Sequence, residues 1–132
     1  MKILGIDPGL TTGMAELEDG KFIHGWEAGT TRDVLAGIER TRPDVVVVED
    51  FILGKPTRYA KPVIELIGVI KYFTRTTTEA KLVMSSPAVL RGALKRVRGV
   101  HPSRHVRSAA AHARRWYHVD ARSKSRKDAP DP

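Results

Sequence analysis

The sequence contains no cysteine and no apolar run long enough to span a membrane. The absence of cysteine excludes disulfides, thiolate metal sites and a cysteine nucleophile, and it fits a reducing compartment. The chain opens on a strand pattern instead of a basic and then apolar leader, so we expect a soluble cytoplasmic protein. Its 132 residues are enough for one domain with a real core and too few for two.

Acidic residues are scarce in the last third of the chain. Residues 91–132 contain 12 Lys or Arg and 3 Asp or Glu, a net charge of +9, whereas residues 1–90 contain 11 basic and 12 acidic residues, a net charge of −1. Such an uneven cationic region is typical of a surface that binds a polyanion, most often nucleic acid. The alternative is a charged surface that only keeps the protein in solution.

Hydrophobic periodicity predicts an α/β domain with the element order βββαβαβαα. The first three strands should form an antiparallel meander, because Asp7-Pro8-Gly9 and Asp19-Gly20 are turn signals. The run Val45 to Val48 follows a predicted helix, so it should be parallel to the first strand, and its continuous valines predict the centre of the sheet. The predicted strands are 2–7, 12–18, 21–28, 45–48 and 81–84.

Four helices are predicted between and after these strands. They cover 31–40, 62–75, 87–98 and 103–117. Pro62 and Pro87 are placed at helix starts, where proline is tolerated, and Ser103 is the expected N-cap of the last helix. Residues 119–132 are polar and charged without apolar periodicity, which predicts a basic disordered tail after a domain of residues 1–118.

Two apolar runs end in carboxylates, Asp7 after the first strand and Glu49 after the valine-rich strand. If the two strands are neighbours, these acids lie side by side at one sheet edge. Mg²⁺ binds few protein carboxylates together with water and substrate phosphates, so the pair beside a basic surface suggests phosphoryl chemistry. Asp50 must point to the other side of its strand, so we expect a structural or capping role for it.

These features resemble RuvC-type Holliday junction resolvases of the RNase H-like superfamily, especially the compact phage-type members. The resemblance rests on residues 3–13 (ILGIDPGLTTG), on the valine-rich strand that ends in Glu49-Asp50-Phe51 and on the element order, and it spans residues 1–117. It implies an RNase H-like fold with a mixed five-stranded sheet flanked by helices. It also implies that Asp7 and Glu49 are metal ligands and that the last helix supplies further ligands, either acids or a His followed three residues later by an Asp.

The last predicted helix departs from this pattern at one position. At roughly 100° per residue, His105, Ser108 and His112 fall within a sector of about 60° and share one helix face. His105 matches the family pattern, but Ser108 stands where an Asp is expected, and a hydroxyl is a weaker ligand for Mg²⁺. Either the two histidines compensate in a natural variant, or the chain is a weakened nuclease, natural or engineered, that still binds junctions.

The resemblance implies a homodimer that cuts branched DNA with Mg²⁺, for which Mn²⁺ would substitute. One ion would activate a water and a second would stabilise the leaving 3′ oxygen, with Asp7 bridging the ions and His105 assisting the water. A two-fold dimer matches the symmetry of a junction, and the helix 62–75 is the expected interface. The residues expected to contact phosphates are Arg58, Tyr59, Lys61, Arg91, Lys95, Arg96 and Arg104.

Three alternatives remain open at this point. A chain without the third acid is also compatible with a protein that binds branched DNA without cutting it. A nuclease that acts on flaps and forks as well as junctions is equally compatible with these residues. The Asp-x-Gly and Thr-Thr-Gly segments also resemble the phosphate loop of actin-like ATPases, but those proteins need two such domains around the nucleotide.

Overall fold

The computed structural model describes residues 1–51, 58 and 60–121. Five strands and four α-helices, with shorter 3-10 and π-helical turns, make up the described chain. The elements are β1 (Lys2–Asp7), β2 (Thr12–Glu18), β3 (Lys21–Ala28), α1 (Thr31–Thr41), β4 (Val45–Glu49), α2 (Ala60–Thr77), β5 (Lys81–Ser85), the 3-10 turn η1 (Pro87–Val89), α3 (Leu90–Ala93), the 3-10 turn η2 (Leu94–Val97), α4 (Arg104–Arg115) and the π-helical turn η3 (Trp116–Asp120).

The strands form one mixed sheet in the order β3-β2-β1-β4-β5. The pairs β1–β2 and β2–β3 are antiparallel, and β1–β4 and β4–β5 are parallel, which confirms the predicted meander and the parallel fourth strand. The Asp19-Gly20 turn joins β2 to β3 with a positive φ at both residues, 50° and 82°. The prediction that β4 is the centre was wrong, because β5 adds outside β4 and leaves β1 in the middle.

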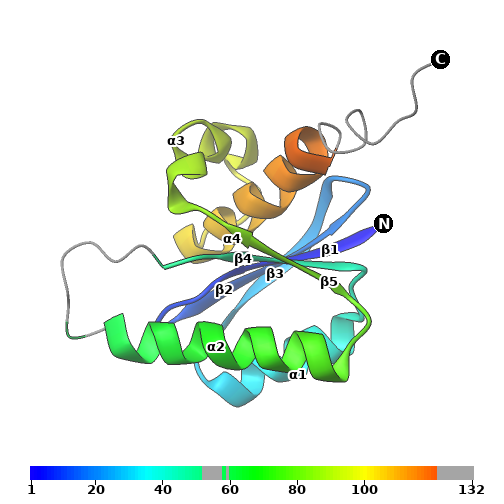
Figure 1. Ribbon diagram of the computed structural model, residues 1–132. Helices are drawn as coiled ribbons and strands as arrows, with labels where there is room; N and C mark the ends of the chain where they lie inside the picture. The colour runs from blue at the N-terminus through cyan, green and yellow to red at the C-terminus, as the bar shows by residue number, and fades with distance from the viewer. Residues whose placement is uncertain (52–57, 59, 122–132) are drawn as a thin grey trace.

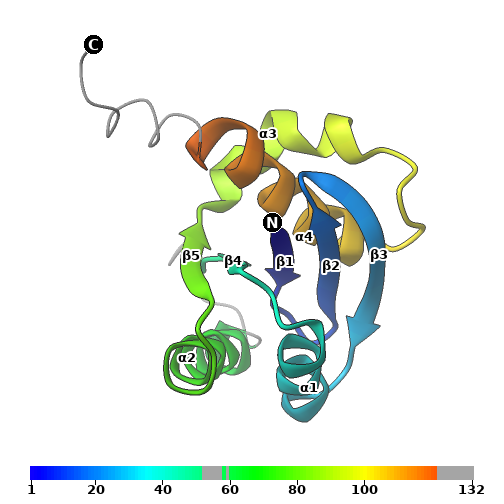
Figure 2. The ribbon, with the colours of Figure 1, turned by 90° about the vertical axis from the view of Figure 1, so that its right-hand side faces the viewer.

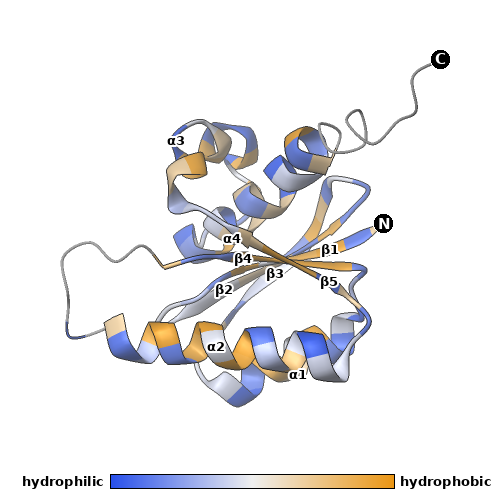
Figure 3. Cartoon of the chain, in the orientation of Figure 1, coloured by the Kyte–Doolittle hydropathy of each residue, from blue (hydrophilic) through white to orange (hydrophobic). Residues whose placement is uncertain are grey.

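Helices cover both faces of the sheet, with α1 and α2 on one side and α3 and α4 on the other (Figures 1 and 2). Successive residues of a strand point to opposite faces. Ile3, Val45 and Val47 therefore pack toward α4, whereas Leu4, Val46 and Val48 pack toward α1 and α2. The apolar strands β4 and β5 lie between these layers (Figure 3).

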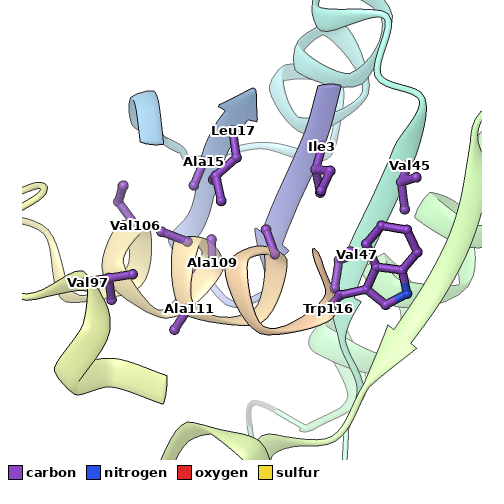
Figure 4. Close-up of a cluster of buried hydrophobic side chains, with 12 residues drawn as sticks. Ile3, Ala15, Leu17, Val45, Val47, Val97, Val106, Ala109, Ala111 and Trp116 are labelled. Atoms are coloured by element: carbon purple, nitrogen blue, oxygen red, sulfur yellow. The ribbon is translucent and has the colours of Figure 1, made fainter. Parts of the chain in front are cut away.

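Small residues allow α4 to lie directly on the strands. A Cβ at Gly5 of β1 would lie 2.1 Å from the carbonyl oxygen of Ala109, and one at Gly13 of β2 would lie 2.0 Å from that of His105. Only glycine permits such close approach of two backbones. Farther along the same helical segment, Trp116 packs beside Val45 and Val47 in the core (Figure 4).

The helix predicted over 87–98 is not continuous. It is divided into η1, α3 and η2, with only four residues in α-helical geometry. Gly92 lies in the middle of this segment, where glycine weakens a helix by about 1 kcal/mol relative to alanine. Leu90, Leu94 and Val97 pack against the α4 cluster, so tertiary contacts hold the short turns in place.

The remaining helix ends differ by a few residues from the predicted ones. Helix α2 begins at Ala60, so Pro62 lies within the first turn, where amides have no partner inside the helix. Ser103 is the N-cap of α4, as predicted, and the helical path continues through η3 to Asp120. Residues 122–132 of the predicted tail lie outside the described residues, so the domain boundary stays a prediction. No helix in residues 1–51, 58 and 60–121 is both long and apolar enough to cross a membrane.

Candidate active site

Three polar residues end the three parallel strands. Asp7 ends β1, Glu49 ends β4 and Ser85 ends β5, and Glu49 pairs directly with Ser85. Ile6 and Val48, which come just before the two acids, point toward α1 and α2. Because side chains alternate, Asp7 and Glu49 point to the α4 side at the same sheet edge. The predicted juxtaposition of the two strand ends follows from the parallel β1–β4 pairing.

Helix α4 brings its predicted polar face to these acids. Ser108 Oγ donates a hydrogen bond to Glu49 Oε2 over 3.1 Å. His105 Nδ1 lies 3.7 Å from Asp7 Oδ2, with the His105 side chain 50% exposed. The N-terminal turn of α4 is held by Ser103, whose hydroxyl accepts from the Val106 amide. The helix therefore places one neutral donor and one accessible imidazole over the carboxylates.

His112 is fully buried behind Glu49. Its Nδ1 is 2.6 Å from Ser85 Oγ, within hydrogen-bond distance. Its Nε2 is 3.2 Å from Glu49 Oε2, a close contact that lacks hydrogen-bond geometry among the described residues. Both ring nitrogens thus lie close to protein oxygens, and only Nδ1 has a hydrogen-bond partner among the described residues. The geometry favours a role in orienting Glu49 over the role of a metal ligand that we considered as compensation for Ser108.

The pKa values of the two acids are shifted in opposite directions. Burial, followed by the charge of Glu49 and a hydrogen bond with it, raises the pKa of Asp7 to about 8, and Ser108 and Arg104 oppose this rise. Burial also raises the pKa of Glu49, but His112, Asp7 and Ser108 together outweigh it and leave that pKa below its usual range. Two acids this close cannot both ionise easily in a partly buried site. Asp7 is therefore the acid of the pair that retains a proton to higher pH.

The donor set can accommodate a divalent cation that takes much of its coordination from outside the protein. Among the described residues, no group of three or more His, Cys, Asp or Glu side chains is arranged to hold a metal ion. Mg²⁺, however, is commonly held by one or two carboxylates, with waters and phosphates completing the shell. A cation between Asp7 and Glu49 would also relieve the repulsion that raises the pKa of Asp7. The two acids and the Ser108 hydroxyl fit such an ion.

Comparison with solved structures identifies the fold. RuvC of Thermus thermophilus in complex with a Holliday junction substrate matches with a TM-score of 0.75 and 20% identity, over 92% of this chain and 96% of that one. Another Thermus thermophilus RuvC structure gives 0.74 and 21%, over 95% and 97%. The chain has the RuvC fold. Fowlpox virus resolvase with Holliday junction DNA gives 0.52 and 22%, over 72% and 70%. No protein-family model and no curated protein matches the sequence.

Within this RuvC fold, the predicted phosphate-contacting residues occupy separate elements. Arg104 lies at the start of α4 and lowers the pKa of Asp7, which places its charge beside the acids. Lys61 is exposed at the start of α2, and the other exposed cations of the set are Arg58, Arg91, Lys95 and Arg96. Tyr59 lies outside the described residues. The Asp50 amide donates to the Ser85 carbonyl and its carboxylate accepts from the Phe51 amide, in keeping with the structural role expected for it.

Sequence reasoning missed Ser85 as a partner in the site of the RuvC fold. The signal was available: Ser85 directly follows the apolar run of β5 and comes at the same phase as Asp7 and Glu49 do in their strands. A lone serine at a strand end is common. Only the pairing of β5 with β4 shows that Ser85 lies next to Glu49. The sequence also could not predict the contact of His112 with Glu49. The His112 side chain is 0% exposed, and this burial depends on how α4 packs on the sheet.

Proposed function

We propose that this chain is a metal-dependent endonuclease that cleaves Holliday junctions and other branched DNA. The observation that carries the proposal is the Asp7–Glu49 pair at the end of parallel strands, facing His105 and Ser108 of α4. Perturbed carboxylates with a near imidazole are typical of hydrolytic sites. The excess of Lys and Arg in residues 91–132 supports a polyanionic substrate.

Asp7 and Glu49, with Ser108 as a weaker neutral ligand, would hold Mg²⁺, and Mn²⁺ would substitute for it. A bound ion would supply charge stabilisation for a phosphate and acidify a water. His105 is accessible and close to Asp7, so its free ring nitrogen is placed to accept a proton from an attacking water. Attack on phosphorus with loss of the 3′ oxygen leaves a 5′-phosphate and a 3′-hydroxyl. Ser85 and His112 keep Glu49 oriented during this step.

A homodimer is part of the proposal. Helix α2 leaves Ile64 44%, Val69 40% and Tyr72 73% exposed on its outer side. Gly68 lies among them, and a Cβ at that position would meet nothing within 4 Å, so a second backbone has room to approach. Exposed apolar side chains on a long helix are suited to self-association. Two symmetric copies would place one acid pair at each of two strands of a junction.

A second function, binding of branched DNA without cutting, is favoured by one observation. Ser108 donates a hydrogen bond to Glu49 where the resemblance calls for a third carboxylate, so the site carries one negative charge fewer. Fewer charges weaken metal affinity and also reduce the repulsion of phosphate.

Localisation in the cytoplasm, expected from the sequence, is proposed for either function.

The decisive experiment compares this chain with Ser108→Asp on labelled four-way junction, flap and linear duplex, with EDTA, Mg²⁺ or Mn²⁺. Paired metal-dependent nicks in the junction by the unchanged sequence support the nuclease. Binding without nicks until Ser108→Asp is made supports the DNA-binding alternative. Equal cutting of all three substrates would contradict a preference for branched DNA. If neither protein binds or cuts any of the substrates, both functions are refuted. Ser108→Asn, neutral and of similar size to Asp, serves as the control.

A further inference from the structure

A cavity of about 630 Å³ lies between α3 and the C-terminal half of α4, apart from the acid pair. Arg91 of α3 and Arg96 of η2 line one side, and Arg114 and Arg115 of α4 line the other. The rest of the wall is mostly small and apolar, including Ala88 and Ala111. Figure 1 shows α3 beside this part of the α4 and η3 path. Four arginines thus line one opening.

None of these four arginines has a carboxylate partner among the described residues. The cavity lining contains no Asp or Glu, and the ion pairs within residues 1–51, 58 and 60–121 leave all four unpaired. Like charges held together without counter-charges destabilise a fold unless an anion joins them. Arginine in particular presents a planar fork that matches phosphate oxygens.

Arg115 adds an unsatisfied donor to the wall. Its Nε is buried and lacks a hydrogen-bond partner among the described residues. Buried donors in folded proteins are nearly always paired, so such a group marks a place where an acceptor is missing. An oxygen-rich anion in the cavity would neutralise the charge of the arginines that line it.

The cavity lies farther along α4 than the candidate active site. Ser108 and Arg115 are seven residues apart on α4, which at a rise of 1.5 Å per residue is about 10 Å. One DNA strand carries a charge about every 3.4 Å along the duplex axis, so this separation corresponds to roughly three phosphates. We propose that the cavity between α3 and α4 binds a backbone phosphate of the DNA arm that leaves the acid pair. This inference rests on the proposed function.

The test uses the full chain in EDTA and measures junction affinity by fluorescence anisotropy at several salt concentrations. The variant Arg114→Gln with Arg115→Gln removes two charges from the cavity. The matched control, Lys21→Gln with Arg32→Gln, removes two charges from β3 and α1. We expect the cavity variant to weaken junction binding about tenfold and to reduce the slope of log K against log salt by up to about 1.8, or 0.9 per lost contact. The control should change affinity less than twofold.

Parallel titrations with pyrophosphate distinguish DNA from a free phosphate compound. If the cavity variant loses pyrophosphate binding but keeps junction affinity, the DNA assignment is overturned in favour of a small phosphate ligand. Equal weakening by the control, or no change in either titration, also overturns it. Arg114→Gln alone repeats the test if the double variant fails to fold. If the unchanged chain neither binds nor cuts junctions, the proposed function itself has failed. If the unchanged chain cuts junctions and the cavity variant binds them as tightly as the unchanged chain does, only this inference is refuted.

Discussion

At the scale of residues, two acids of similar intrinsic acidity behave differently because their neighbours differ. Glu49 receives a hydrogen bond from Ser108 and lies next to the His112 ring, whereas Ser108 and Arg104 lower the pKa of Asp7 too little to offset its burial and the charge of Glu49. Burial disfavours a negative charge on both acids. The negative charge stays on Glu49, because its neighbours stabilise that charge better. A divalent cation at this pair, as proposed, would have to displace the proton of Asp7 before both carboxylates could bind it.

Replacement of Asp7 by Asn tests the role of this carboxylate in cutting. We expect Asp7→Asn to abolish metal-dependent nicking of a four-way junction, because Asn keeps the shape but supplies no charge for a cation. Junction affinity should be unchanged or higher, since a negative charge near phosphate is removed. Gel assays of nicking and binding on the same preparation would measure both. Loss of binding together with cutting would indicate instead that Asp7 is structural.

The raised pKa of Asp7 also predicts how stability depends on pH. With a pKa of about 8 in the folded state and 3.8 as its ordinary value, Asp7 binds more protons in the folded state between these values. The free energy of unfolding should thus fall as pH rises from about 4 to about 8. Asn cannot ionise, so Asp7→Asn should become the more stable protein at pH 8 by on the order of 1–3 kcal/mol and match the parent below pH 4.

Urea unfolding at a series of pH values, with EDTA present, would measure this difference. Glu49 contributes in the opposite sense, since its lowered pKa favours the folded state above its usual value and that contribution is lost in acid. To a first approximation, Glu49 makes the same contribution to stability in the parent and in Asp7→Asn. Parallel stability curves for the parent and Asp7→Asn between pH 4 and 8 would contradict the shift assigned to Asp7.

At the scale of elements, the site depends on how closely α4 approaches β1 and β2. Gly5 and Gly13 leave no room for a Cβ below the backbone of Ala109 and His105. Gly13 pairs with Asp7 across the β1–β2 ladder, so the close approach occurs at the same level as the site. The distance between His105 and Asp7 is therefore set by two glycines that carry no chemistry themselves.

Gly5→Ala should push α4 away from the sheet. We expect a loss of about 2–4 kcal/mol in the free energy of unfolding, because the new methyl group would meet the rigid backbone of Ala109. Gly29→Ala is the control: its Cβ would meet nothing within 4 Å, and stability should change by about 0.5 kcal/mol or less. Denaturant unfolding gives both values, and equal stability of the two variants would argue against a tight α4–β1 contact.

At the scale of the whole molecule, the described basic region and the exposed apolar residues of α2 lie on opposite sides of the sheet. The described part of the basic region, residues 91–121, lies in α3, η2, α4 and their connections on one side of the sheet, and the exposed apolar residues of α2 lie on the other layer (Figure 2). If the basic region binds DNA and α2 forms the dimer contact, as proposed, both surfaces can be used at the same time. This arrangement suits a symmetric protein that holds one substrate with two copies.

Tyr72→Glu tests the self-association surface. Tyr72 is 73% exposed on α2, so Glu should leave the monomer fold intact but place a charge in the centre of the proposed dimer contact. We expect sedimentation to show a weakening of self-association of at least about tenfold, with unpaired nicks in junction substrates. Ile23→Glu, at a 55% exposed position of β3, should leave the dimer unchanged. A parent chain that sediments as a monomer at all concentrations would refute the dimer.

Local sequence patterns were sufficient for most elements and for the two acids. Strand alternation, the Asp19-Gly20 turn and the Ser103 cap depend on neighbours within a few residues, and each is found in the structure. Segment 87–98 was mispredicted as one helix because its shape is decided by contacts with α4. The sequence also did not determine the order of the strands beyond the meander. A parallel strand that follows a helix can join the sheet on either side of the preceding strand.

The sequence by itself determined the types of element, the face on which each strand residue lies, the position of Asp7 and Glu49 at strand ends and the excess charge of the last third. These properties follow from short-range sterics, turn chemistry and the period of side-chain direction. Only the tertiary structure decided that Ser85 and His112 lie beside Glu49, that burial and the charge of Glu49 raise the pKa of Asp7 and that four arginines line one cavity. Each of these depends on residues far apart in the chain, whose desolvation and distance exist only after α4 has packed on the sheet.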